Sequence, residues 1–363
     1  PESTKAPGTT KVPVTTQAPT SAEAPGLYDS DNNLIASWDQ LVNTYGMRAD
    51  VDYPDMTSTA SALLNTGVLK NGTRLVIGDI TSIGSYAFSD CTNLESVTLS
   101  KSVTIISDYA FKGCTSLENA TIPQSMTIIS DYAFIGCTSL TNFIVNKNSP
   151  DLSSDGIALY TENKTVLFQV PKGVTSFTIP DGVTDIDYDA FRGCTNLKSV
   201  TIPQSVTIIR ASTFAGCTSL ERFLVDPNNP KYSSDGIALY NKDKTVLAQV
   251  PNSVTSFTVP KSVTGILDWA FSKCTSLESV TIPNSVTDIG VRAFSDCTSL
   301  KSVTIPQSVT VIDGYAFIGC TSLESILVDP NNLQYSSDGV ALYYKNQTTL
   351  IQVPNGVTSF TIP

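Results

Sequence analysis

Eight cysteines are the residues of this chain with the most obvious chemical potential, because thiolates bind metals and thiols pair as disulfides. A phenylalanine precedes each of them by three residues and a leucine follows each by three. No pair has the CxxC spacing used by zinc and iron–sulfur sites. Because the gaps between them are always 23 or 57 residues, they are predicted to be buried free thiols, one in each copy of a repeated unit. These cysteines are Cys91, Cys114, Cys137, Cys194, Cys217, Cys274, Cys297 and Cys320.

Carboxylates near the N-terminus form a second candidate site. Asp29, Asp31 and Asn33 stand at alternate positions, as ligands do at the start of a calcium loop. The sixth position of that loop is Leu34 instead of glycine, and the twelfth is Gln40 instead of glutamate. We therefore expect a hairpin turn at this point and no metal ion.

A third group of carboxylates recurs in the motif Ser-Ser-Asp-Gly, as Asp155, Asp235 and Asp338. Acid–base catalysis needs two carboxylates within about 10 Å of each other. Equivalent positions three coils apart in a stacked repeat would be about 15 Å apart, at ~4.8 Å for each coil. The motif is therefore predicted to be a turn and not a catalytic pair.

Composition restricts the function further. The chain of 363 residues contains no histidine, which excludes Ser-His-Asp and Cys-His nucleophiles and histidine-ligated metals. The net charge of −11 disfavours nucleic acid as a partner. No apolar run is long enough to span a bilayer. We expect a protein that is not an enzyme, has no cofactor or metal, and does not cross a membrane in this segment.

The repeated unit reads VTxIxxxAFxxCTSLxSVTIPxS and predicts one coil of a solenoid, because such units bury their apolar faces only by stacking. The alternation of apolar and polar residues in 200–202 and 280–282 indicates a short strand, which the following proline ends. The AFxxC part has apolar residues three apart, which predicts a turn of 3₁₀- or α-helix.

The strands are expected at spacings of 23 or 34 residues. Each 34-residue step contains an insert (153–171, 233–251 and 336–354) whose alternating arms and polar tip (161–164, 241–244 and 344–347) predict a β-hairpin. The central outward residues of the eleven predicted strands are Thr98, Thr121, Ile144, Thr178, Thr201, Leu224, Thr258, Thr281, Thr304, Leu327 and Thr361.

Segments such as DAFRGCTNLKSVTIPQSVTII and RAFSDCTSLKSVTIPQSVTVI resemble BspA-type (Treponema-type) leucine-rich repeats over roughly residues 80–363. The resemblance implies a leucine-rich repeat solenoid: a right-handed, β-rich β/α superhelix. It also implies that the eleven strands form a parallel sheet on the concave side, interrupted in sequence by the three hairpins. Members of this family are secreted or surface-anchored bacterial proteins associated with adhesion. The sequence departs from the family pattern at Thr213, which stands in place of alanine, and in the inserts, which lack AFxxC.

The ends of the chain differ from the repeats. Residues 1–26 are rich in Pro and Thr and are predicted to be an extended spacer. Residues 27–80 are expected to cap the solenoid at 81–363, with a helix near 38–46 that begins at a Ser37–Gln40 capping box and ends at Gly46. Trp38, Leu41 and Val42 should face inward. The last predicted strand would leave an open sheet edge, which an edge-to-edge dimer would cover.

The outward row of the concave sheet consists mainly of Ser and Thr, which either forms an inert soluble face or binds a protein. Both interpretations stay open here. The function we expect is a non-catalytic, adhesin-like binding module at the bacterial cell surface that contacts a protein on a host or another bacterium; the alternative is a structural stalk without its own ligand. The predicted ligand-binding residues are Asn119, Thr121, Asn142, Ile144, Thr201, Arg222, Leu224, Thr281, Thr304 and Leu327.

Overall fold

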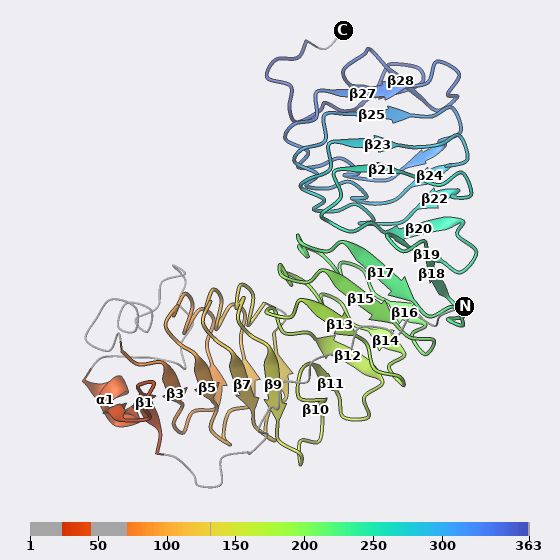
Figure 1. Cartoon of the computed structure of the whole chain (residues 1–363). Coiled ribbons are helices and arrows are strands. Elements are labelled where there is room, and N and C mark those ends of the chain that lie inside the picture. Colours follow the sequence, from red (N-terminus) through yellow and green to blue (C-terminus); the bar gives the residue numbers. More distant parts are fainter. Residues whose placement is uncertain (1–23, 45–70, 131, 362–363) are drawn as a thin grey trace.

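A computed structural model describes residues 24–44, 71–130 and 132–361. It confirms the repeat solenoid: short parallel strands stack along a curved axis, and helix is almost absent from the described residues (Figure 1). Most of the predicted spacer, Gly46 and the middle of the predicted cap lie outside those residues.

The N-terminal part begins with an antiparallel pair and one short helix. Its elements are β1 (Gly26–Tyr28), β2 (Leu34–Ser37), α1 (Trp38–Asn43) and β3 (Arg74–Val76). The predicted capping box is confirmed, because the Gln40 amide donates to the Ser37 hydroxyl and the Ser37 amide donates to the Gln40 side chain. Leu41 is buried, whereas Trp38 and Val42 are half-buried.

One row of longer strands contains the segments predicted from the SVTI part of the unit. We call them the repeat strands, and their outward side the repeat-strand face. They are β5 (Ser96–Thr98), β7 (Asn119–Ile122), β9 (Asn142–Val145), β13 (Ser176–Thr178), β15 (Ser199–Ile202), β17 (Arg222–Val225), β21 (Ser256–Thr258), β23 (Ser279–Thr281), β25 (Ser302–Ile305) and β27 (Ser325–Val328).

A second row of two-residue strands comes from the VTxI part of the unit, and we call these the side strands. They are β4 (Ser82–Ile83), β6 (Ile105–Ile106), β8 (Ile128–Ile129), β14 (Asp185–Ile186), β16 (Ile208–Ile209), β22 (Gly265–Ile266), β24 (Asp288–Ile289) and β26 (Val311–Ile312).

Each 34-residue step contains three antiparallel strands, and its second and third strands pair as a hairpin. The first insert is β10 (Leu152–Ser154), β11 (Leu159–Thr161) and β12 (Val166–Gln169). The second is β18 (Tyr232–Ser234), β19 (Leu239–Asn241) and β20 (Val246–Gln249), and the third is β28 (Tyr335–Ser337), β29 (Leu342–Tyr344) and β30 (Leu350–Gln352).

The prediction of one continuous eleven-stranded sheet was wrong. The repeat strands pair as β5-β7-β9, β13-β15-β17, β21-β23 and β25-β27, with β3 of the N-terminal part beside β5, and Thr361 lies in no strand. At each insert the chain itself occupies the edge of the preceding strand, because the amides of Phe143, Phe223 and Ile326 donate to carbonyls of the insert at 2.8–3.0 Å. The next repeat strand therefore cannot pair there. The ladder is also interrupted between β23 and β25.

The inserts divide the molecule into three blocks, each with its own hydrophobic core. We call them the first block (24–145), the middle block (152–225) and the last block (232–328). Figure 1 shows that the solenoid axis bends along these blocks, so that the strands of the first and last blocks run in different directions. The first junction lies between the first and middle blocks, and the second junction lies between the middle and last blocks.

The predicted helical turn at AFxxC was also wrong, since these segments form non-helical turns. The residue before the cysteine has a left-handed backbone in every unit, for example Asp90 at φ 57° and Gly113 at φ 70°, and such a residue ends a right-handed helix. Where another AFxxC coil follows, the phenylalanine amide also bonds to that coil: Phe88 donates to Ala110 at 2.7 Å and Phe271 to Ala293 at 2.7 Å. These amides are consequently not available to a helix.

The phenylalanines of AFxxC stack as a column inside each block. The rings of Phe271, Phe294 and Phe317 have centroids 4.5 Å and 5.3 Å apart. The columns end at the inserts, which have no AFxxC phenylalanine. There, rings such as Phe223 and Phe257 from the flanking repeat strands pack edge-on against the column.

Candidate functional site

All eight cysteines are buried and free, as predicted. The thiols of Cys114 and Cys297 donate to the carbonyls of Phe88 and Phe271, at 3.1 Å in both cases. Burial raises the pKa of Cys194, Cys217 and Cys274. These thiols are therefore structural hydrogen-bond donors, a role that spacing alone did not indicate.

The two groups of carboxylates form turns, as predicted. Asp29 Oδ1 accepts from the amides of Asp31 and Asn33 at 3.0 and 2.9 Å in the β1–β2 hairpin. In the Ser-Ser-Asp-Gly motif, Asp235 Oδ1 accepts from the amides of Ile237 and Ala238, both at 2.9 Å. Among the described residues no cluster of three or more potential ligands is placed to hold a metal ion.

The repeat strands place most of the predicted binding residues as neighbouring pairs on the repeat-strand face. The ladder sets Asn119 beside Asn142, Thr121 beside Ile144, Thr201 beside Leu224, and Thr304 beside Leu327. The Asn119 and Asn142 side chains form a hydrogen bond of 2.9 Å. Residues of different blocks are not brought together by this pairing, and Thr281 on β23 pairs with Thr258 instead.

Three exposed aliphatic side chains recur on this face. Ile144, Leu224 and Leu327 are 42%, 43% and 40% exposed, and each lies on the last repeat strand before an insert. Because the insert diverts the chain after β9, β17 and β27, no following repeat strand pairs with them. The three residues therefore sit at sites where a partner could cover apolar surface.

The middle block has a hollow at the carboxyl ends of its repeat strands. It has a volume of about 360 Å³ and includes two of the predicted residues, Thr201 and Leu224. Thr178, Asp181 and Asp226 also line it. Arg222 lies on β17 with Leu224, and its guanidinium is 3.7 Å from Glu221. The hollow thus combines an exposed leucine with two carboxylates.

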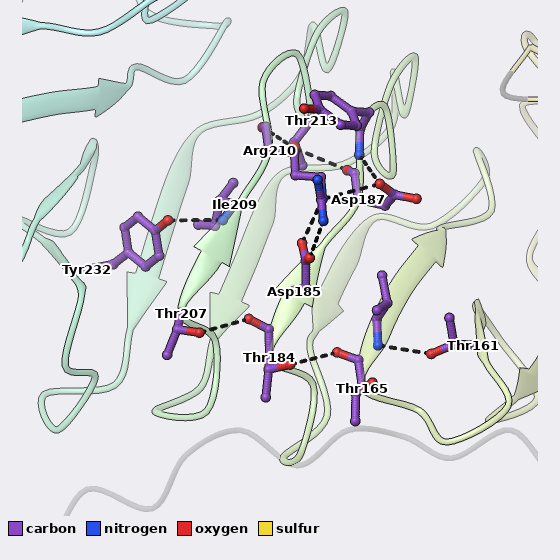
Figure 2. A network of polar contacts seen from close by, with 12 residues as sticks. Thr161, Thr165, Thr184, Asp185, Asp187, Thr207, Ile209, Arg210, Thr213 and Tyr232 are labelled. Carbon is purple, nitrogen blue, oxygen red and sulfur yellow. Dashed lines mark hydrogen bonds and ion pairs between the residues drawn. The ribbon is translucent and has the colours of Figure 1, made fainter.

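A charged network on the side strands of the same block was not found from the sequence. Figure 2 shows Arg210 reaching back to the preceding coil, where it donates to Asp185 at 2.6 and 3.1 Å. Its guanidinium is also 3.5 Å from Asp187 and 5.2 Å from the centre of the Tyr188 ring. Hydrogen bonding to Asp185 raises the pKa of Arg210 further above its usual range.

Structural hydrogen bonds surround this network. The hydroxyls of Thr184 and Thr207 donate to the carbonyl one coil back, at 3.3 and 3.4 Å, and form a row along the side strands (Figure 2). The Ile209 amide donates to the hydroxyl of Tyr232 at 3.0 Å. These contacts fix the wall of a second cavity, of about 290 Å³, at the second junction. The signal that could have revealed it is the departure of Arg210, Ser212 and Ala248 from the residues at the same positions of other copies.

The model of the BspA type leucine rich repeat region matches residues 71–158, 161–240 and 244–361, in six copies. The chain belongs to this family. No curated protein matches it in a whole-sequence comparison. The family assignment agrees with the regular coils described above.

Three solved structures are similar to this BspA-type chain. A leucine-rich repeat protein from Eubacterium ventriosum is 25% identical, with a TM-score of 0.48, and the match covers 70% of this chain and 67% of that one. A leucine rich cell surface protein from Faecalibacterium prausnitzii is 30% identical, with a TM-score of 0.43, over 71% of this chain and 60% of that one. The pneumococcal vaccine antigen PcpA is 21% identical, with a TM-score of 0.41, over 78% and 66%. The chain thus spans less than two thirds of the second and third proteins.

Proposed function

We propose that this leucine-rich repeat protein is a non-catalytic, adhesin-like binding protein of the bacterial cell surface, and that its repeat-strand face contacts a protein on a host or another bacterium. In this proposal residues 1–26 are a spacer, residues 27–80 a cap and residues 81–363 the binding solenoid. Surface location is supported by the similar structure from Faecalibacterium prausnitzii, which is that of a leucine rich cell surface protein. Among the described residues no helix has the length and hydrophobicity to cross a bilayer.

The observation that carries the proposal is the hollow of the middle block. Leu224 is 43% exposed there, in the same coil as Asp226 and two coils from Asp181, and both carboxylates line the hollow. Interfaces gain most of their affinity from a few apolar anchors surrounded by polar groups. Because the lining carboxylates are acidic and the net charge is −11, the partner surface that fits best is apolar at its centre and basic at its rim.

The experiment compares two variants of matched exposure. Leu224→Asp changes the repeat-strand face, and Ile208→Asp changes a side strand of the same block, where Ile208 is 48% exposed. Binding of the labelled protein to immobilised mucin, extracellular matrix proteins and whole bacterial cells is measured for each. We expect Leu224→Asp to weaken the strongest interaction at least tenfold and Ile208→Asp to leave it unchanged. If the wild type binds no surface, or both variants bind equally, the proposal is wrong.

The alternative is a structural stalk that forms arrays. It is favoured by the near-identity of the repeated units, which would place the same contacts at regular intervals along an array. An edge-to-edge dimer is the simplest such assembly. Analytical ultracentrifugation distinguishes the two: the stalk requires concentration-dependent self-association, and the binding protein does not.

A further inference from the structure

The cavity at the second junction is a product of one copy of the repeat and not of the family pattern. It is lined by apolar side chains that include Phe214, Leu239 and Ala248, and by polar groups that include Arg210, Gln249 and Asp268. Phe214 and Leu239 are buried, whereas Leu267 and Asp268 at the rim are exposed. The cavity is therefore a pocket with an apolar floor that is reached from the surface.

The first junction shows what the same positions hold in another copy. Three residues that line the pocket, Ser212, Ala248 and Asp268, occupy the repeat positions of three aromatic residues 80 positions earlier. Those residues are Tyr132, Phe168 and Tyr188.

Two of these aromatic side chains, Phe168 and Tyr132, contact other residues at the first junction, whereas Tyr188 is 54% exposed and lies 5.2 Å from the guanidinium of Arg210. Phe168 packs, partly buried, against the core of the first block, and the guanidinium of Arg192 lies 4.9 Å from the centre of the Tyr132 ring. The glutamine after Phe168 is also covered: Gln169 is 3% exposed, whereas its counterpart Gln249 is partly exposed. At these three positions the second junction thus has small or polar side chains where the first junction has aromatic ones.

Two large side chains form part of the wall of the pocket. Tyr232 and Arg210 are larger than Leu152 and Ser130, their counterparts at the first junction, but both are held in place. Tyr232 accepts the Ile209 amide at 3.0 Å, and Arg210 is bound by two oxygens of Asp185. A pocket whose walls are held in this way stays open to a ligand from the surface.

The size and lining of the pocket define the occupant. An apolar cavity of about 150 Å³ accepts a benzene ring, so 290 Å³ leaves space for one aromatic side chain but not for a large ligand. The amide of Gln249, the hydroxyls of Ser212 and Thr213 and the carboxylate of Asp268 could bond to a hydroxyl or indole N–H at its tip. Gln249, Thr213 and Asp268 already bond to other residues of the chain, so a hydroxyl or indole N–H would add a polar contact that a purely aliphatic side chain cannot make.

We propose that the second junction is an anchor pocket for a tyrosine or tryptophan side chain of a protein partner, formed where three aromatic residues of the first junction are replaced by smaller or polar ones. The identification of the occupant as part of a protein rests on the proposed binding function. The existence of the pocket does not depend on that function. Because the lining includes no residue of the repeat-strand face, the pocket is a second contact point on the side-strand surface of the molecule.

The test uses N-acetyl-L-tyrosinamide as the probe, with N-acetyl-L-leucinamide as the comparison, and follows binding to the whole protein by NMR chemical-shift titration. Ligands of this size reach dissociation constants of about 1 mM at ordinary ligand efficiency. We expect saturable binding of the tyrosine amide and at least tenfold weaker binding of the leucine amide. Ala248→Phe, which introduces the residue found at the equivalent position of the first junction, should weaken binding of the tyrosine amide at least tenfold.

Ser212→Tyr is a second filling variant, in case the phenylalanine is not accommodated, and thermal unfolding shows that each variant is folded. The proposal is wrong if the wild type shows no saturable binding, if both amides bind equally, or if neither filled variant loses affinity. None of these results bears on the repeat-strand face, whose function is tested by Leu224→Asp. Conversely, the pocket is supported if the wild type binds the tyrosine amide and Ala248→Phe or Ser212→Tyr abolishes this binding. This conclusion holds even if the surface-binding assay finds no partner.

Discussion

In a regular coil of the last block, the Phe294 ring lies between those of Phe271 and Phe317, and the Cys297 thiol donates to a main-chain carbonyl at 3.1 Å. The second insert, which follows β17, has no AFxxC turn. The repeat-strand ladder is broken there, and Leu224 on β17 stays exposed. The regular coils are fixed by contacts that every copy repeats. The inserts interrupt those contacts, and the exposed anchors and both cavities lie next to them.

The largest loss of stability is expected from a substitution in a regular coil. Phe294→Ala removes a fully buried ring that has stacked neighbours on both sides. We expect a loss of about 3–5 kcal/mol in the free energy of unfolding, the usual cost of a large buried cavity. Phe168→Ala, in an insert where the ring is only partly buried, should cost less than half as much. Urea denaturation followed by circular dichroism measures both, and equal losses would contradict the comparison.

The next effect concerns the motif that shapes each insert. Asp235→Ala removes the acceptor of the Ile237 and Ala238 amides and of the Tyr240 hydroxyl, all at 2.9 Å. We expect a loss of about 2–3 kcal/mol, at ~1 kcal/mol for each hydrogen bond. The control is Asp243→Ala at the exposed tip of the same insert, which should change stability by less than ~0.5 kcal/mol. A loss of similar size in both variants would show that the motif does not hold the insert.

A smaller effect is expected where the middle block departs from the repeat. Arg210→Ala breaks the pair with Asp185, whose side chains are 37% and 11% exposed, so we expect a small loss of stability. Arg210→Lys should recover only part of it, because an ammonium group cannot form the two parallel hydrogen bonds. Arg222→Ala, which loses a 3.7 Å contact on an exposed arginine, is the matched control with no expected loss. Thermal unfolding resolves these differences.

The smallest effect is a pH dependence of stability that arises from the buried thiols. Burial raises the pKa of Cys194, Cys217 and Cys274, so the folded chain keeps protons that the unfolded chain releases above its thiol pKa of about 8.5. Their contribution is complete below that pH and falls as the pH rises, by at most ~1.4 kcal/mol for each thiol and pH unit. Cys274→Ala should flatten the decline measured between pH 8 and 10, and an unchanged slope would contradict this assignment.

The regular part of this structure could be predicted from sequence because its cause is local and repeated. Proline after each SVTI segment, buried cysteine in each unit and a capping box at Ser37 each depend on neighbours a few residues away. Stacking then follows from the period. The free thiols and the turns at Asp29 and Asp235 were predicted for the same reason.

The departures from prediction have a different origin. The AFxxC segments were expected to be helical because apolar spacing does not reveal that Asp90 adopts a left-handed backbone or that the Phe88 amide bonds to the next coil. The broken sheet depends on where the insert places its backbone beside Phe143. The second-junction pocket depends on Ala248, whose small size matters only beside the fixed Tyr232 and Arg210. Such features arise between coils and are not visible within one unit.

One measurement tests the central claim, that the repeat-strand face beside the inserts is the recognition surface. A triple variant replaces Ile144, Leu224 and Leu327 by aspartate, and a matched triple variant replaces Ile128, Ile208 and Val311, which are exposed to a similar degree on side strands of the corresponding coils. Both are compared with the wild type for binding to the surface that it binds best. We expect the affinity of the first triple variant for that surface to fall at least a hundredfold and the affinity of the second to stay unchanged. Retained binding by the first, or equal loss by both, would contradict the central claim.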